Sequence, residues 1–308
     1  MISKPIIGFV AAPFTAMNHD GSLNLEVIPA YARHLAENGI AGAFVNGTTG
    51  EGYSLSVAER IAAAEAWIAH RPAGVSIIVH VGAESIVDAK NLAKHAEQTG
   101  ADAIGAMAPV FFRPGLDALV AYCAEIASAA PSLPFYYYHI PSMTGAAVAV
   151  LPLLERAAVE IPTFRGVKFT HNDLMEYGLC RSFENERFDM LFGRDEILLS
   201  ALVLGAKGMV GSTYNYAMPV FNSVLAAFDE GRPTDAAEAQ KKAMSLVQIL
   251  ARNGGLSAGK ALMSGVGLEM GPCRAPNRSL DARTTERIVA EARAIGVFGD
   301  SGPEWPAS

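Results

Sequence analysis

Lys168 is the residue of this chain whose type and surroundings offer the most distinctive chemistry. It lies in the run 164–170 (FRGVKFT), whose apolar and aromatic residues predict a strand. Because side chains alternate along a strand, Gly166, Lys168 and Thr170 share one face. A lysine held against apolar walls has a lowered pKa, and its neutral amine can form a Schiff base with a ketone. The alternative is a solvent-facing lysine just past the strand.

A glycine-spaced loop at residues 46–52 (NGTTGEG) carries two hydroxyl groups, those of Thr48 and Thr49. Glycines let backbone N–H groups approach an anion closely, and the hydroxyls add donors. The loop therefore suits a carboxylate or a phosphate. The alternative is a tight turn in which Thr48 or Thr49 caps the following helix.

Three consecutive tyrosines end another expected strand. With a period of two, Tyr136 and Tyr138 share one face and Tyr137 takes the other, so at most two of them face the same interior. Tyr138 is nearest the strand end. Aromatic residues are favoured in strands, and the spacing alone favours a packing role over a catalytic one.

Two further polar runs, 193–196 (GRDE) and 211–216 (GSTYNY), follow the last two expected strands. They place Asp195, Glu196 and Ser212 where a substrate rich in hydroxyl groups could be held. Asp195 and Ser212 are also good helix N-cap types, and capping is compatible with ligand binding.

Composition narrows the function classes. The chain has 308 residues, of which 51% are hydrophobic and 18% charged, with a net charge of −7. The apolar content excludes a disordered chain, and the negative charge argues against a nucleic-acid binder. Three scattered cysteines without a C-x-x-C pair indicate neither disulfides nor a zinc knuckle and favour a reducing compartment. No apolar run approaches the roughly 18 residues of a membrane span, so we expect a soluble cytoplasmic protein.

Seven histidines show no metal-binding spacing such as H-x-H or H-E-x-x-H. We therefore expect no metal; only ligands gathered from separate strands would leave no such local spacing.

Short apolar runs alternate with longer segments of helical spacing, as in a parallel sheet covered by helices. The expected strands are 6–12, 41–45, 76–81, 103–108, 135–138, 164–169, 190–192 and 208–210. The expected helices are 25–38, 56–70, 84–98, 116–129, 147–157, 173–183, 196–204 and 218–230. Three more helices are expected at 236–252, 257–266 and 284–295, before a loose tail around 302–304.

Eight β/α units within about 230 residues fit a TIM (β/α)8 barrel better than a doubly wound sheet, which would carry a nucleotide fingerprint. We expect a catalytic barrel over residues 1–231 and a C-terminal helical extension over 232–308. In such a barrel, reactive groups lie at the carboxyl ends of the strands.

Four motifs in this order resemble the pyruvate-dependent class I aldolases grouped around dihydrodipicolinate synthase and N-acetylneuraminate lyase. They are residues 47–51 (GTTGE), 138–141 (YHIP), 166–168 (GVK) and 211–215 (GSTYN). The resemblance covers nearly the whole chain. The runs 136–145 (YYYHIPSMTG) and 193–196 are most similar to the family members that cleave sialic acid.

The resemblance implies reversible cleavage of N-acetylneuraminate to pyruvate and N-acetylmannosamine. Lys168 would form the Schiff base, and no other cofactor would be needed. Tyr138 would carry protons to and from the aldehyde oxygen. Thr48 and Thr49 would hold the pyruvate carboxylate. The implied sugar-binding residues are Thr170, Gly193, Asp195, Glu196 and Ser212.

Two departures from the family pattern bear on the subclass. Synthases carry an arginine where this chain has Met143, which cannot pair with a carboxylate and so disfavours dihydrodipicolinate synthesis. Many members carry a tyrosine where this chain has Phe111, at a subunit contact. Phe111 has no hydroxyl to extend a proton relay to a neighbouring subunit.

Two rival functions remain open. One is a sister aldolase acting on a 2-keto-3-deoxy sugar acid, for which Arg194 is the candidate cation. The other is a non-catalytic barrel that binds a keto acid, which would need the carboxylate loop but not the amine of Lys168. The resemblance also suggests a homotetramer with a small-molecule substrate and no nucleic-acid or membrane partner.

Overall fold

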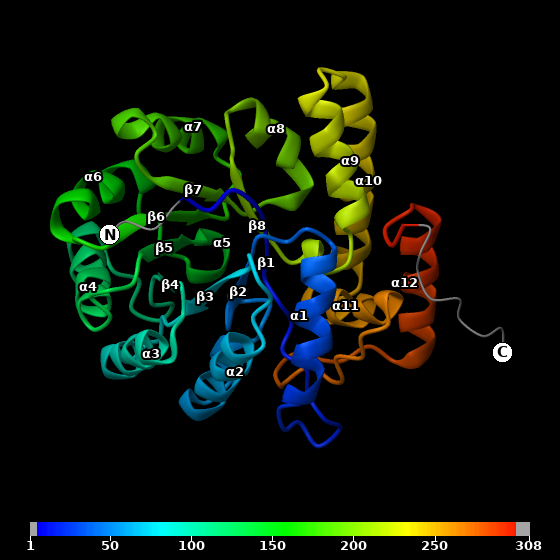
Figure 1. Ribbon diagram of the computed structural model, residues 1–308, viewed down its shortest axis with the longest axis horizontal. Coiled ribbons are helices and arrows are strands. Elements are labelled where there is room, and N and C mark those ends of the chain that lie inside the picture. Colours follow the sequence, from blue (N-terminus) through cyan, green and yellow to red (C-terminus); the bar gives the residue numbers. More distant parts are fainter. Residues whose placement is uncertain (1–4, 300–308) are drawn as a thin grey trace.

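A closed barrel of parallel strands forms the body of the computed structural model, which describes residues 5–299 (Figure 1). Each strand pairs with its neighbours in chain order, and β1 closes the barrel against β8 with Gly8 opposite Gly208. The eight strands within residues 5–299 are Gly8–Ala11 (β1), Gly42–Val45 (β2), Ser76–His80 (β3), Ala103–Met107 (β4), Phe135–His139 (β5), Phe164–Phe169 (β6), Asp189–Phe192 (β7) and Gly208–Gly211 (β8). The expected TIM barrel is therefore confirmed.

Helices between the strands cover the outside of the barrel (Figure 1). They are Ile28–Glu37 (α1), Val57–Ala69 (α2), Ile86–Thr99 (α3), Leu116–Ser128 (α4), Pro141–Thr144 (α5), Val150–Glu160 (α6), Leu174–Ser182 (α7), Leu198–Val203 (α8) and Met218–Asp229 (α9). The sequence pattern does not predict the short helix α5. Residues 25–27 and 196–197, expected to be α-helical, lie in 3₁₀ turns instead, at Leu25–Val27 and Asp195–Ile197.

A helical extension follows the barrel, as expected. It comprises Pro233–Arg252 (α10), Leu256–Leu262 (α11), continued by a 3₁₀ turn, and Ala282–Ala294 (α12). Helix α10 runs beside α9 (Figure 1). Gln240 on α10 donates to the backbone oxygen of Asp195 at 3.1 Å and accepts from Leu199 N at 2.8 Å, so the extension holds the loop after β7. The boundary expected at 231/232 falls in the link between α9 and α10. The tail expected around 302–304 lies outside the described residues.

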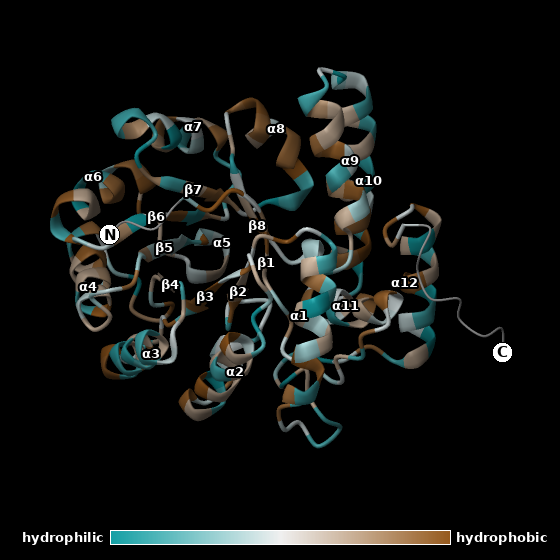
Figure 2. Ribbon diagram, in the orientation of Figure 1, coloured by the Kyte–Doolittle hydropathy of each residue, from teal (hydrophilic) through white to brown (hydrophobic). Residues whose placement is uncertain are grey.

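The core has two parts because each strand buries both faces. The inner part fills the barrel and includes Val10, Phe44, Tyr136, Tyr138 and Leu191. The outer part lies between strands and helices, and it takes the alternate residues, such as Tyr137. Figure 2 shows hydrophobic residues concentrated on the strands and mixed residues along the surrounding helices. Over residues 5–299, none of the helices combines the length and apolarity needed to cross a bilayer.

Candidate active site

Lys168 lies inside the barrel near the carboxyl end of β6, and its side chain is only 3% exposed. Its Nζ lies 3.9 Å from the ring centroid of Phe44 and 4.1 Å from that of Tyr138. Burial lowers the pKa of Lys168 from 10.5 to about 7, with the carboxylate of Asp195 opposing the change. A substantial fraction of the amine is therefore neutral at pH 7. The alternative of a solvent-facing lysine is wrong.

Tyr138 faces the same interior from the adjacent strand, β5, where it is paired in register with Lys168. Its hydroxyl lies 3.4 Å from Oγ1 of Thr48. Burial raises the pKa of Tyr138, and the nearby hydroxyl of Thr48 opposes that rise. The phenol is therefore protonated at neutral pH and lies close to another hydroxyl, an arrangement suited to proton transfer.

The loop that carries Thr48 and Thr49 follows β2 and turns sharply toward the barrel mouth. A Cβ at Gly52 would lie 2.0 Å from the backbone oxygen of Asn46, so only glycine fits there. Thr48 is exposed and Thr49 half-buried, so both hydroxyls remain available to a ligand. Neither threonine caps the next helix.

Helix α2 is capped instead by Ser56, whose side chain accepts from Glu59 N at 3.2 Å in a capping box. Because Ser56 caps this helix, the alternative interpretation of Thr48 or Thr49 as its cap is wrong.

A buried ion pair anchors this loop to the C-terminal extension. Nζ of Lys260 on α11 lies 2.9 Å from Oε1 of Glu51, and both side chains are at most 2% exposed. Lys260 also donates to Pro272 O at 2.6 Å, and Glu51 Oε2 accepts from Arg274 N at 2.7 Å. Because the two charges share these hydrogen bonds away from water, they fix the loop in one position.

Asp195 lies after β7 and is buried, with one carboxylate oxygen held by Thr213. Its Oδ2 accepts from Thr213 Oγ1 at 2.5 Å and from Thr213 N at 3.2 Å. Its Oδ1 has no hydrogen-bond partner among residues 5–299. A Cβ at Gly211 would lie 2.0 Å from this free oxygen, so glycine there makes room for it. Burial raises the pKa of Asp195 to about 6, with Thr213 opposing the rise.

The remaining expected sugar-binding residues surround the same end of the barrel. Oγ1 of Thr170 is buried with no partner among the described residues, and a Cβ at Gly193 would lie 2.1 Å from it. Glu196 and Ser212 are half-buried. Asp195 lies inside a 3₁₀ turn whose N-cap residue is Arg194, so it does not cap that turn. Ser212 is the N-cap residue of the next 3₁₀ turn, but its side chain makes no cap hydrogen bond.

Two residues on the rim bear on specificity. Arg194 pairs with Glu196 through Nη2 and Oε1 at 2.7 Å, so its charge is already compensated. Met143 lies on α5, just after β5, with 60% of its side chain exposed.

Sequence reasoning missed several residues that build the site. Phe44 supplies a wall of the lysine pocket, and a Cβ at Gly47 or Gly105 would lie 3.0 Å from its ring. Nothing in the local pattern of β2 distinguishes Phe44 from any other core residue. Thr213 lies within the polar run 211–216, whereas Asp195 lies in the loop after the preceding strand. No local sequence pattern therefore predicts the hydrogen bond between them.

Comparisons with known proteins agree with this geometry. The model of the dihydrodipicolinate synthetase family matches residues 5–295. The N-acetylneuraminate lyase of Mus musculus is 44% identical over 298 residues, covering 95% of this chain and 93% of the relative. That of Xenopus tropicalis is 46% identical over 278 residues, covering 89% and 91%.

A solved structure gives the same result. The sialic acid aldolase of Aliivibrio salmonicida superposes with a TM-score of 0.94 at 40% identity, covering 98% of this chain and all of that one. The match to the family model spans the barrel and most of the helical extension. This chain belongs to the dihydrodipicolinate synthetase family.

Proposed function

We propose that this protein is a class I aldolase that reversibly cleaves N-acetylneuraminate to pyruvate and N-acetylmannosamine. The observation that carries the proposal is the buried amine of Lys168, whose pKa is lowered to about 7 between two aromatic rings. Relatives at 44% and 46% identity that are named N-acetylneuraminate lyase support the substrate.

The reaction begins at the keto carbon of the substrate. The neutral amine of Lys168 attacks this carbon, and the resulting carbinolamine takes up one proton from solvent and loses water to give a protonated imine. Backbone N–H groups of the loop after β2 and the hydroxyls of Thr48 and Thr49 bind the neighbouring carboxylate. The apolar walls around Lys168 keep a reactive fraction of the amine neutral at physiological pH.

Cleavage then uses the imine as an electron sink. The bond between the third and fourth carbons breaks, and its electron pair moves into the imine to give an enamine. The hydroxyl proton on the fourth carbon passes to Tyr138, and the phenolic proton passes on through Thr48, whose Oγ1 lies 3.4 Å away. The aldehyde leaves, the enamine is protonated on carbon, and water releases pyruvate from Lys168.

The sugar portion would lie between the loops after β6, β7 and β8. The unpartnered Oδ1 of Asp195 can accept from a substrate hydroxyl, and Thr170 Oγ1 can donate or accept. Glu196, Gly193 and Ser212 complete this part of the site.

Rim residues favour a neutral acceptor aldehyde over a carboxylated one. Met143 offers no charge to an acceptor carboxylate, and Arg194 is paired with Glu196 at 2.7 Å. Both observations weigh against dihydrodipicolinate synthesis and against a sugar acid that carries a second carboxylate at its far end.

We also propose that the protein is a cytoplasmic homotetramer. Phe111 and Phe112, in the loop after β4, are 78% and 83% exposed, and an exposed aromatic pair of this kind favours a subunit contact. Sedimentation equilibrium should give four times the chain mass. A monomeric mass would contradict the assembly.

The function is tested by release of pyruvate from N-acetylneuraminate. Wild-type protein should release pyruvate, Lys168→Ala should not, and the exposed-lysine control Lys241→Ala should match wild type. Borohydride should trap pyruvate on Lys168 as a stable mass increase. Release only from a 2-keto-3-deoxy sugar acid would support the sister aldolase. Saturable pyruvate binding with neither adduct nor turnover would support the non-catalytic barrel.

A further inference from the structure

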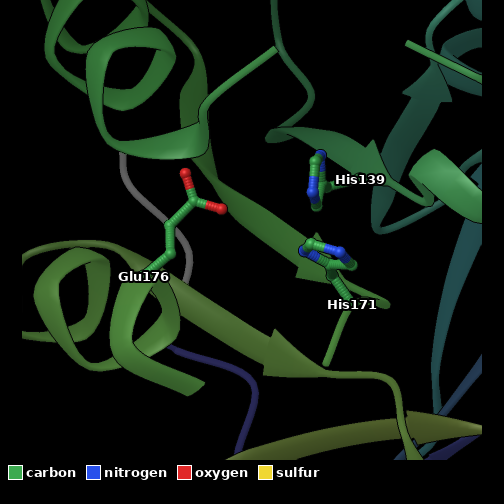
Figure 3. A group of neighbouring side chains, drawn as sticks. All are labelled: His139, His171 and Glu176. Carbon is green, nitrogen blue, oxygen red and sulfur yellow. The ribbon is translucent and has the colours of Figure 1, made fainter. Parts of the chain in front are cut away.

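Three potential metal ligands meet outside the barrel interior. They are His139 at the end of β5, His171 in the loop after β6 and Glu176 in the first turn of α7 (Figure 3). One ligand atom from each residue lies within 4.8 Å of the other two. The three residues come from different elements, so no short sequence motif predicts this cluster.

His139 is the buried member of this group. Tyr138 faces the barrel interior, so its neighbour His139 faces outward, beneath the helices, where it is 3% exposed. Neither of its ring nitrogens has a hydrogen-bond partner within residues 5–299. A neutral imidazole carries one donor and one acceptor, and leaving both unpaired in a buried place is unfavourable. This ring therefore lacks the partner that its burial requires.

The other two residues face His139. The ring centroid of His171 lies 5.5 Å from that of His139, and Nδ1 of His171 also has no partner among the described residues. Glu176 points toward both rings from α7 (Figure 3). Its Oε1 accepts from Val150 N at 2.5 Å, which orients the carboxylate as a supporting hydrogen bond orients a metal ligand.

We propose that His139, His171 and Glu176 bind one divalent transition-metal ion of the Zn²⁺ class. Two imidazoles and a carboxylate are a recurring ligand set for Zn²⁺, whereas Mg²⁺ and Ca²⁺ prefer oxygen ligands alone. Three protein ligands leave a fourth position for water. Ligands about 2.0 Å from a tetrahedral ion lie roughly 3.3 Å apart. The ligand atoms here lie within 4.8 Å of one another, and His171 and Glu176 are half-buried, so metal binding would require these side chains to rotate toward His139.

The site lies on the opposite face of β5 from Tyr138. The Schiff-base reaction of Lys168 does not use this ion. The ion instead links β5, the loop after β6 and α7. It therefore stabilises the outer side of β5 and β6, whose inner side carries Tyr138 and Lys168.

The test uses untagged full-length protein stripped with a chelator and dialysed against Zn²⁺. Wild type should retain one ion per chain by elemental analysis, and Zn²⁺ should raise its unfolding temperature. Co²⁺ loaded in place of Zn²⁺ should give visible d–d bands without a thiolate charge-transfer band, which separates this site from one made by cysteines.

Two variants test the ligands themselves. Glu176→Gln keeps an amide oxygen to accept from Val150 N, so the fold is preserved while the anionic ligand is lost. His171→Asn removes a half-buried ligand. Each should weaken Zn²⁺ binding about tenfold or more and abolish the temperature shift. The exposed-histidine control His70→Asn should bind as wild type does.

Two outcomes would overturn the site. One is a wild-type protein that retains no stoichiometric Zn²⁺. The other is stoichiometric binding that survives unchanged in both Glu176→Gln and His171→Asn, which would locate the ion elsewhere. Because binding and thermal stability are measured without substrate, these results do not depend on the aldolase proposal.

Discussion

Replacing Lys168 by methionine should make the fold more stable at neutral pH. Burial lowers the pKa of Lys168 from 10.5 to about 7, which means that the folded barrel disfavours the ammonium form. In the unfolded chain the same lysine is charged and well solvated. Methionine has a similar shape and no charge to desolvate, so the variant escapes this penalty while filling the same space.

The magnitude follows from the two pKa values. Between pH 7 and 10.5 the unfolded lysine binds a proton that the folded one has lost, so wild-type stability rises with pH across this window. At about 1.4 kcal/mol per pKa unit, the advantage of Lys168→Met is about 4 kcal/mol at pH 7 and about 2 kcal/mol at pH 9. The change with pH isolates the charge from any difference in packing.

Urea unfolding at fixed protein concentration, followed by circular dichroism at pH 7, 8 and 9, measures this difference. Lys241→Met, at an exposed site, serves as the control and should show no advantage that changes with pH. An advantage of Lys168→Met that stays constant from pH 7 to 9 would refute the reasoning, because it would show that the amine titrates alike in both states.

Three further predictions concern the site. The rate of borohydride-trapped adduct formation should rise with pH through about 7 and then level off, and a rate still rising at pH 9 would contradict this. Asp195→Asn should move the midpoint of this rise to lower pH, because the Asp195 carboxylate raises the pKa of Lys168. Tyr138→Phe should lower kcat about 100-fold or more while the pyruvate adduct still forms, and a loss of only a few-fold would leave Tyr138 as a packing residue. Lys260→Met should destabilise the fold by about 3–5 kcal/mol, as measured by urea unfolding, because it leaves Glu51 buried without its partner charge. Adding Glu51→Gln should recover part of that loss, and strictly additive effects would show that the pair is not coupled.

Local periodicity determined much of this protein. The eight strand and helix pairs follow from the spacing of apolar residues, because a parallel sheet covered on both faces requires continuous apolar runs. The alternation of side chains along each strand puts Tyr138 on one face of β5 and Lys168 on one face of β6, and the register of the two strands makes those faces the same side of the wall. Helix α5 was not predicted because four residues are too few to show the periodic spacing of apolar residues that identifies a helix.

Only the tertiary structure decided which residues meet across the barrel. Phe44 packs against Lys168, and Thr213 donates a hydrogen bond to Asp195. Glu51 forms an ion pair with Lys260. The two residues of each pair are distant in sequence. The convergence of His139, His171 and Glu176 has the same origin. Each of these contacts depends on how strand register and barrel closure bring separate elements to one place, and the pattern within any single element carries no information about that.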